Sequence, residues 1–114
     1  MNEIRSIARF QIHDGQRDAF EALAAECVEI VRTQDTGTLG YDVFYNADRT
    51  ECVIHERYES SEALLDHVGH LGDRFGSMLG ISDFSAEVFG SPSQALLEAV
   101  AGLDVTVYEH ATSA

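Results

Sequence analysis

Apolar residues in this chain alternate between the spacing of a strand and the spacing of a helix, and this alternation is the strongest constraint on the fold. Between Gln16 and Gln34 apolar residues recur every three or four positions, which predicts an amphipathic helix. The run Ile4–Ile12 mixes β-branched and polar residues and ends at a His-Asp-Gly turn, which predicts a strand. We expect Asp14 to cap the helix and Gly37 to follow its end.

Six further segments continue the pattern. Two strand-like runs, Leu39–Asn46 and Glu51–Tyr58, are separated by a short polar connection and predict a hairpin. One apolar helical face then runs from Ala63 to Leu79, with Ser60 or Ser61 before it as the N-cap and Gly80 at its end. The remaining segments predict a strand, a short helix that begins near the single proline, and a last strand, over residues 83–89, 92–100 and 103–108.

This order predicts an α+β fold of the ferredoxin-like split βαβ type, with an antiparallel sheet, helices on one face and an extra C-terminal helix and strand. A chain of 114 residues has the size of one domain, with a core over 4–90 and the additional elements over 91–109. A sheet that carries Ile54, Val43 and Val105 needs a cover on its second face. A second copy of the chain is the simplest cover, so we expect a homodimer.

Lysine is absent from the chain, whose seven basic residues are all arginines, and 20 acidic residues bring the net charge to -13. Without lysine the chain can form neither a Schiff base nor a GxxxxGK[ST] phosphate loop. A surface this negative repels nucleic acids and anionic membranes, so we expect neither as a partner. No apolar run approaches a membrane span, the N-terminus lacks the pattern of a signal peptide, and Cys27 and Cys52 fall on apolar faces. We therefore expect a cytoplasmic protein with reduced thiols.

Two ionisable residues, His67 and Glu56, fall on apolar faces of a predicted helix and strand. His67 fits either a core histidine with one hydrogen bond or a general base, since an imidazole with a pKa near ~6.5 accepts protons at neutral pH. Glu56 fits either a structural ion pair or helix cap, or a carboxylate that orients the histidine or a substrate hydroxyl. A metal site of His67, His70 and Glu56 is conceivable, but it lacks a metal-binding signature and we expect His70 in solvent. We expect no metal.

Four of the ten aromatic residues lie on the predicted hairpin, and others add apolar surface elsewhere, including Phe75 on the second long helix. They fit either a packed core or a flat pocket for an aromatic ligand, in which tyrosine hydroxyls orient the ligand. The candidates for contact with a ligand are Tyr41, Phe44, Tyr45, Tyr58 and Phe75. The sequence contains no GxSxG, CxxC or GxGxxG motif, which argues against hydrolase and nucleotide-binding functions.

Three motifs within residues 4–90 occur together: Gly37-Thr-Leu-Gly-Tyr-Asp-Val-Phe, then Glu56-Arg-Tyr-Glu-Ser after a variable hairpin, then Glu62-Ala-Leu followed by His67. This arrangement resembles the antibiotic biosynthesis monooxygenase family, which includes proteins assigned as quinol monooxygenases. The resemblance implies a dimeric α/β barrel, in which two sheets face each other and each chain holds a pocket between its sheet and helices.

For function, the resemblance implies oxidation of a phenolic or quinol substrate by O2 without flavin, haem or metal. His67 matches the helix histidine of the family and Glu56 its strand-end glutamate, which makes them the candidate catalytic residues. Haem-degrading members use a tryptophan together with their histidine, and this chain has no tryptophan. The alternative function is a non-catalytic barrel that binds a small molecule or a partner protein. A pocket too small for an aromatic ring, or a His67 without a polar neighbour, would favour that alternative.

Overall fold

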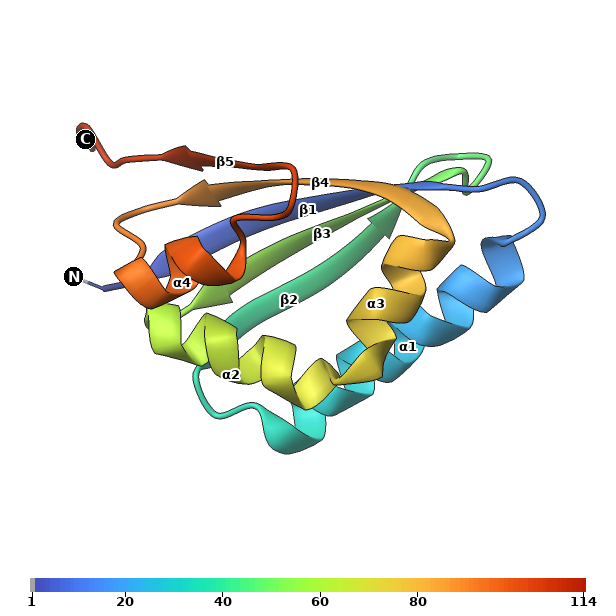
Figure 1. Cartoon of the computed structure of the whole chain (residues 1–114), viewed down its shortest axis with the longest axis horizontal. Helices are drawn as coiled ribbons and strands as arrows, with labels where there is room; N and C mark the ends of the chain where they lie inside the picture. Colours follow the sequence, from blue (N-terminus) through green and yellow to red (C-terminus); the bar gives the residue numbers. More distant parts are fainter. Residues whose placement is uncertain (1) are drawn as a thin grey trace.

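The structure, a computed structural model that describes residues 2–114, consists of one sheet with helices on one of its faces (Figure 1). The sheet order is β2-β3-β1-β4-β5, and the first four strands of that order pair antiparallel. The elements in chain order are β1 (Ile4–Ile12), α1 (Arg17–Gln34), β2 (Thr38–Tyr45), β3 (Glu51–Tyr58), α2 (Ser61–Leu71), α3 (Asp73–Gly80), β4 (Ser82–Phe89), α4 (Gln94–Ala99) and β5 (Val105–Tyr108). The predicted α+β, ferredoxin-like fold with a C-terminal helix and strand is confirmed.

The C-terminal strand β5 pairs parallel with β4, in contrast to the rest of the sheet. Parallel neighbours require a crossover connection, and α4 lies in the connection between these two strands. The crossover carries α4 to the same side of the sheet as the other helices (Figure 1).

The second long helix is not continuous, which corrects the prediction of one helix over 63–79. It breaks at Gly72, which has a φ of 57° and a ψ of -128°, into α2 and α3. A left-handed φ is open to glycine because it lacks a Cβ atom. The break redirects the chain so that Phe75 and Met78 of α3 pack against the core beside the sheet.

Only one of the two predicted N-terminal helix caps is observed. Ser60 caps α2 as predicted, since its side chain accepts a hydrogen bond from the Ala63 N–H at 3.1 Å. The expectation that Asp14 caps α1 is wrong, because the N-cap position falls on Gln16 and forms no side-chain cap. The intervening Gly15 has a φ of 80° and places Asp14 in a turn before the helix.

The two faces of the sheet differ in composition. Val43, Ile54 and Val105, which suggested an uncovered second face, lie on the helix-covered face, so that part of the argument is corrected. Strand alternation sends the intervening residues to the open face. This face carries Arg5, Ile7, Arg9, Phe44, Val53, His55, Arg57, Glu87, Phe89 and Tyr108.

The helices and the two cysteines relate to the prediction of a cytoplasmic protein with reduced thiols. Within residues 2–114 no helix has both the length and the apolar character needed to cross a membrane. Cys27 and Cys52 are free and buried, and burial raises the pKa of the Cys27 thiol to about 11 and that of the Cys52 thiol to about 12. Both cysteines therefore act as small apolar residues of the core.

Candidate active site

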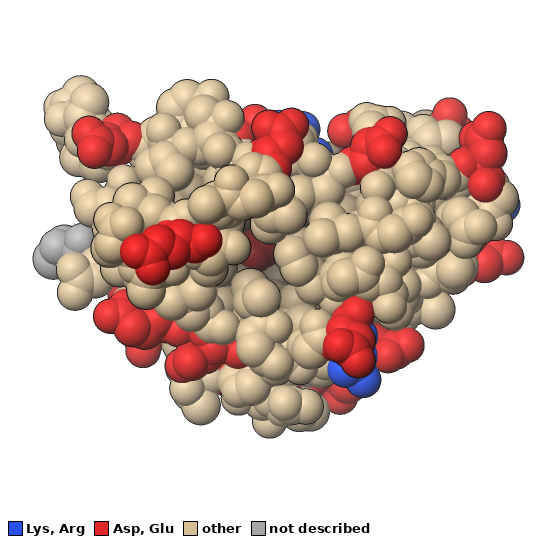
Figure 2. Space-filling view, in the orientation of Figure 1, with Lys and Arg blue, Asp and Glu red and all other residues tan. Residues whose placement is uncertain are grey.

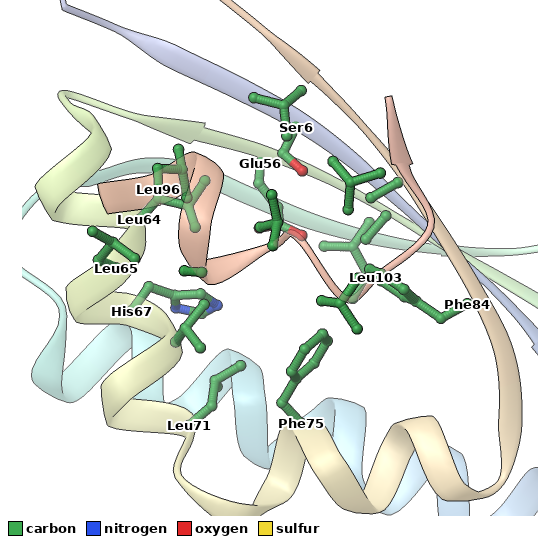
Figure 3. A pocket seen from close by; sticks show the side chains of 18 of the residues that line it. Ser6, Glu56, Leu64, Leu65, His67, Leu71, Phe75, Phe84, Leu96 and Leu103 are labelled. Atoms are coloured by element: carbon green, nitrogen blue, oxygen red, sulfur yellow. The ribbon is translucent and has the colours of Figure 1, made fainter. Parts of the chain in front are cut away.

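A cavity of about 130 Å³ lies between the covered face of the sheet and the helices α2, α3 and α4. Figure 2 shows its mouth as a hollow near the centre of the view, with acidic atoms at its depth. Figure 3 shows the side chains of His67 and Glu56 pointing into it from opposite walls. The other walls are almost entirely apolar and include Ala8, Ile54, Leu64, Leu71, Phe75, Phe84, Val88, Leu96 and Leu103.

His67 reaches the cavity from α2, with only 3% of its side chain exposed. Its Nδ1 lies 2.7 Å from Oδ2 of Asp35, in the connection between α1 and β2. The rings of Tyr41 and Tyr58 flank the imidazole at centroid distances of 5.1 and 5.6 Å. His67 is therefore held both by packing and by a hydrogen bond to a buried carboxylate.

Asp35 accepts three hydrogen bonds although it is almost fully buried. Besides His67, the Thr38 hydroxyl donates to Oδ2 at 2.7 Å and His70 Nδ1 lies 2.7 Å from Oδ1. Burial alone would raise the pKa of Asp35, but the hydrogen bonds from His70, Thr38 and His67 outweigh it and lower the pKa below its ordinary value. Asp35 is therefore ionised at neutral pH and accepts hydrogen bonds from both histidine rings.

Gly37 explains how the chain brings Asp35 to the histidines. A Cβ atom on Gly37 would lie 2.6 Å from the Cβ of Ala63, so only glycine allows the α1–β2 connection to pack this closely on α2. The Glu59 N–H donates to the Gly37 carbonyl at 2.9 Å and holds the two segments together. This close approach places Asp35 beside His67 and His70.

The hydrogen bond to Asp35 determines which nitrogen of His67 is available for chemistry. An ionised carboxylate accepts a hydrogen bond from Nδ1–H, so the proton of the neutral ring stays on Nδ1 and the Nε2 lone pair is free. Burial lowers the pKa of His67 below its ordinary value, although the bond to Asp35 acts in the opposite direction. His67 thus stays neutral, with Nε2 as the ring nitrogen that can accept a proton from a ligand.

Glu56 reaches the cavity from β3, on the wall opposite His67. Its carboxyl group accepts a hydrogen bond from the hydroxyl of the fully buried Tyr58. Burial raises the pKa of Glu56 to about 7, against the effect of the Tyr58 bond. Both protonation states of Glu56 are therefore populated near neutral pH, so the group can donate or accept a proton.

The aromatic candidates divide into three groups. Tyr41 and Phe75 line the cavity, while Tyr58 lies behind its wall and contacts Glu56 and His67. Phe44 is 53% exposed on the open face, where it packs edge-on against His55, because strand alternation directs it away from the helices. Tyr45 faces the helices but lies at the hairpin end of β2, under the guanidinium of Arg49. Phe44 and Tyr45 therefore do not line the cavity.

Two expectations about the histidines need correction. His70 is only partly exposed and shares Asp35 with His67, where a solvated side chain was expected. Glu56 does not orient His67, because the partner of Nδ1 is Asp35 and the Glu56 carboxyl bonds Tyr58. With both Nδ1 atoms on one carboxylate, the histidines and Glu56 are not arranged as the metal-binding set that their spacing allowed.

Asp35 and the cavity-lining residues near the C-terminus were not predicted from the sequence as parts of the site. Asp35 lies at the C-terminal end of α1, where the helix dipole disfavours a carboxylate. An acidic residue at this position, close to a Thr-Gly-Thr segment, was the available signal that the carboxylate has a partner elsewhere.

Comparisons with known proteins agree with this architecture. The Mycobacterium tuberculosis protein Rv0793, which bears a provisional monooxygenase name, is 40% identical over 63 residues, which are 55% of this chain and 61% of that protein. Its solved structure matches with a TM-score of 0.71 at 28% identity, over 82% of this chain and 99% of that chain.

Two other solved structures share the fold at low identity. MupZ from Pseudomonas fluorescens covers 100% of this chain and 94% of its own, with a TM-score of 0.85 and 20% identity. A variant of SnoaB, a cofactor-independent oxygenase from Streptomyces nogalater, covers 82% of this chain and 97% of its own, with a TM-score of 0.68 and 14% identity.

The profile of one protein family matches residues 4–72, more than half of the chain, including both His67 and Glu56. Its description is antibiotic biosynthesis monooxygenase. The chain therefore belongs to the antibiotic biosynthesis monooxygenase family.

Proposed function

We propose that this protein is a monooxygenase that oxidises a quinol or phenolic aromatic small molecule with O2 and without a bound cofactor. The observation that carries the proposal is the pairing of His67 with Asp35 at the wall of an apolar cavity. The pair leaves a neutral Nε2 acceptor facing a space in which a phenol would be shielded from water.

In the proposed reaction His67 Nε2 takes the proton of the phenolic hydroxyl. The resulting phenolate is electron-rich enough to reduce O2 directly, so the protein has to supply a base and a dry pocket. In a phenol a ring C–H para to the hydroxyl becomes a carbonyl. In a para-quinol a ring C–H beside a hydroxyl-bearing carbon becomes C–OH, and the two original hydroxyls become the carbonyls of a hydroxyquinone. One oxygen atom of O2 enters the product, the other leaves as water with the two hydrogens that the substrate loses, and the substrate provides all four electrons.

Glu56 is proposed as the second catalytic residue. In its protonated form it donates a proton to the reduced oxygen species, and in its ionised form it takes a proton back from the carbon that is oxidised. Tyr58 holds the Glu56 carboxyl in place through its hydroxyl, so it acts as a positioning residue. Tyr41 and Phe75 provide walls for the aromatic ring.

Two relatives support the reaction class. Rv0793 carries a monooxygenase name, and SnoaB is described as a cofactor-independent oxygenase. Two features of the cavity support the proposal over simple binding: it has the volume of about one aromatic ring, and His67 has a polar neighbour.

Oxygen uptake tests the proposal. The purified protein is mixed with phenols and hydroquinones of one, two and three rings, and O2 consumption is followed together with quinone formation by absorbance. We expect one mole of O2 to be consumed per mole of quinone and no H2O2 to accumulate, because the second oxygen atom leaves as water. The rate should fall as His67 becomes protonated at acidic pH, because the protonated ring cannot accept a proton. If no phenol is oxidised but one binds, the non-catalytic binding function replaces the proposal.

We also propose that the protein is a homodimer in the cytoplasm. The open face of the sheet exposes Phe44 and Tyr108 to 53% and 49%, and a second copy would cover these rings. The free, buried cysteines fit a reducing compartment. Sedimentation at micromolar concentration tests the dimer, and a monomer there would contradict it.

A further inference from the structure

The segment after β4, over residues 91–108, covers the cavity, and we name it the roof segment. It contributes five of the residues that line the cavity: Leu96, Ala99, Val100, Leu103 and Val105. Figure 3 shows Leu96 and Leu103 reaching the cavity from this segment, and Phe75 and Phe84 also line it. The family profile ends at residue 72, so the roof segment lies outside the matched region.

Hydrogen bonds and packing hold the roof segment in place at both ends. At its start the Ser93 N–H donates to the Ser61 hydroxyl of α2 at 2.9 Å, and Leu96 is buried with only 1% exposure. At its end β5 pairs with β4, and the Ala86 N–H donates to the Asp104 carbonyl at 2.9 Å. Leu103 lies directly before this last anchor. Its position at the cavity is therefore held by the structure around it.

The volume beneath the roof segment limits the size of a ligand. The cavity measures about 130 Å³. An apolar cavity of about 150 Å³ holds one benzene ring. One aromatic ring therefore fills the cavity, and a fused second ring would have to project through the mouth or displace the roof segment.

The chemistry of the lining limits the charge of a ligand. Within residues 2–114 the lining includes the ionisable groups Glu56, His67 and Tyr41, and no arginine. Burial raises the pKa of the Tyr41 hydroxyl, so this group stays neutral. A carboxylate or sulfonate on the ligand would therefore be buried without a counter-ion. The net charge of -13 adds long-range repulsion of anions.

We propose that the roof segment restricts the active site to neutral phenols and quinols with a single aromatic ring, and that Leu103 is a specificity-determining residue. The proposal rests on the monooxygenase function proposed above and narrows its substrate class. One hydroxyl of the ring meets His67 Nε2, and the opposite side of the ring faces Glu56.

Anaerobic binding measurements test this inference without turnover. Calorimetry compares hydroquinone, 1,4-dihydroxynaphthalene and 4-hydroxybenzoate as ligands of the unmodified protein. Leu103→Ala enlarges the cavity, and Leu97→Ala is the matched control because Leu97 is 38% exposed on α4 of the same segment. Thermal unfolding of both variants checks that they fold.

We expect the unmodified protein to bind hydroquinone at least about tenfold more tightly than either other ligand. Leu103→Ala should tighten dihydroxynaphthalene binding by about tenfold relative to hydroquinone, while Leu97→Ala leaves the ratio unchanged. Equal affinities of the unmodified protein for one and two rings, equal binding of 4-hydroxybenzoate, or no binding of hydroquinone would overturn the inference. Identical ratios in the two variants would overturn the role of Leu103.

The oxygen-uptake experiment separates this inference from the proposed function. If single-ring ligands bind selectively but no O2 is consumed, the substrate-class limit stands as a property of a binding site and the monooxygenase function fails. If O2 is consumed equally well with one-ring and three-ring substrates, the function stands and the size limit fails.

Discussion

The helix-covered face of the sheet carries few ionisable groups, and these are buried or partly buried. The open face carries many ionisable groups, which form solvent-exposed ion pairs. Glu56, on the covered face, shares a buried hydrogen bond with Tyr58, and burial raises its pKa to about 7. Glu87, on the open face, lies 3.7 Å from the guanidinium of Arg9, and both side chains contact solvent. The same residue type thus has different chemistry on the two faces.

This comparison shows how one set of strands serves two purposes. Because successive side chains of a strand point to opposite faces, each strand contributes alternately to the cavity and to the open surface. Burial on the covered face changes proton affinity, which favours acid–base chemistry there. Three of the seven arginines, Arg5, Arg9 and Arg57, lie on the open face, where exposed ion pairs contribute little to stability. The proposed dimer contact would therefore use the face that lies away from the acid–base groups of the cavity.

Replacement of the proposed base should give the largest difference in activity between a variant on the covered face and a variant on the open face. His67→Asn keeps an N–H donor for Asp35 but removes the Nε2 acceptor. We expect the oxidation rate to fall by roughly two to four powers of ten with the fold intact. The matched control is His55→Asn, because His55 is exposed on the open face.

Steady-state oxygen uptake and circular dichroism measure these effects. If His67→Asn and His55→Asn retain equal activity, His67 is a core histidine and the covered face carries no base. A His67→Asn protein that unfolds would assign the histidine a structural role as well.

The pH dependence of stability should depend on Glu56. Since burial raises its pKa from 4.5 to about 7, the folded state holds this proton more tightly than the unfolded chain does. The contribution is complete below pH 4.5 and is lost as the pH rises through about 7. The loss amounts to about 3 kcal/mol in the free energy of unfolding.

Glu56→Gln should remove this dependence while it retains an acceptor for the Tyr58 hydroxyl. Urea unfolding of both proteins at fixed concentration, between pH 4 and pH 8.5, measures the difference. Glu109→Gln is the control, because Glu109 is exposed and loses the same charge. Parallel pH profiles for the unmodified protein and Glu56→Gln would mean that Glu56 is not desolvated.

Asp35→Asn tests whether the buried carboxylate orients His67. An asparagine amide cannot accept hydrogen bonds from His67, His70 and Thr38 as a carboxylate does, so the ring of His67 loses its defined tautomer. We expect activity to fall about 10- to 100-fold, as for loss of other partners that orient a functional histidine. Nitrogen NMR of His67 should show a shift from the Nδ1–H form to a mixture, and Asp42→Asn on the exposed part of β2 should leave the spectrum unchanged. An unchanged tautomer in Asp35→Asn would contradict the orienting role.

The parts of the molecule that were predictable from sequence are those with local causes. The first and third strands were predicted with their observed ends, and the Ser60 cap was predicted from its position before an apolar helical face. The break at Gly72 was not predictable, because an isolated glycine is tolerated inside a helix and only packing of α3 on the core favours the bend.

The candidate site was also predicted only in part. Periodicity placed His67 and Glu56 on inward faces, but it could not supply their partners. The bond between Asp35 and His67 joins residues 32 positions apart and depends on the contact between Gly37 and α2. The cavity lining from the roof segment likewise depends on the crossover between β4 and β5.

The proposed dimer should respond to salt in a way that tests the role of the open face. Two chains that each carry a charge of -13 bring together -26, and at 0.01 M salt the Debye length of ~30 Å leaves that repulsion unscreened. Exposed ion pairs across the interface would act in the opposite direction, but such pairs contribute little. We therefore expect the dissociation constant to fall by roughly threefold to tenfold between 0.01 M and 1 M NaCl, measured by sedimentation equilibrium. Phe44→Ser should weaken the dimer at every salt concentration because it removes apolar surface and leaves the charge unchanged. A dimer that weakens as salt is added would show that ion pairs of Arg5, Arg9 or Arg57 dominate the interface, and would reverse the assignment of the open face to apolar contact.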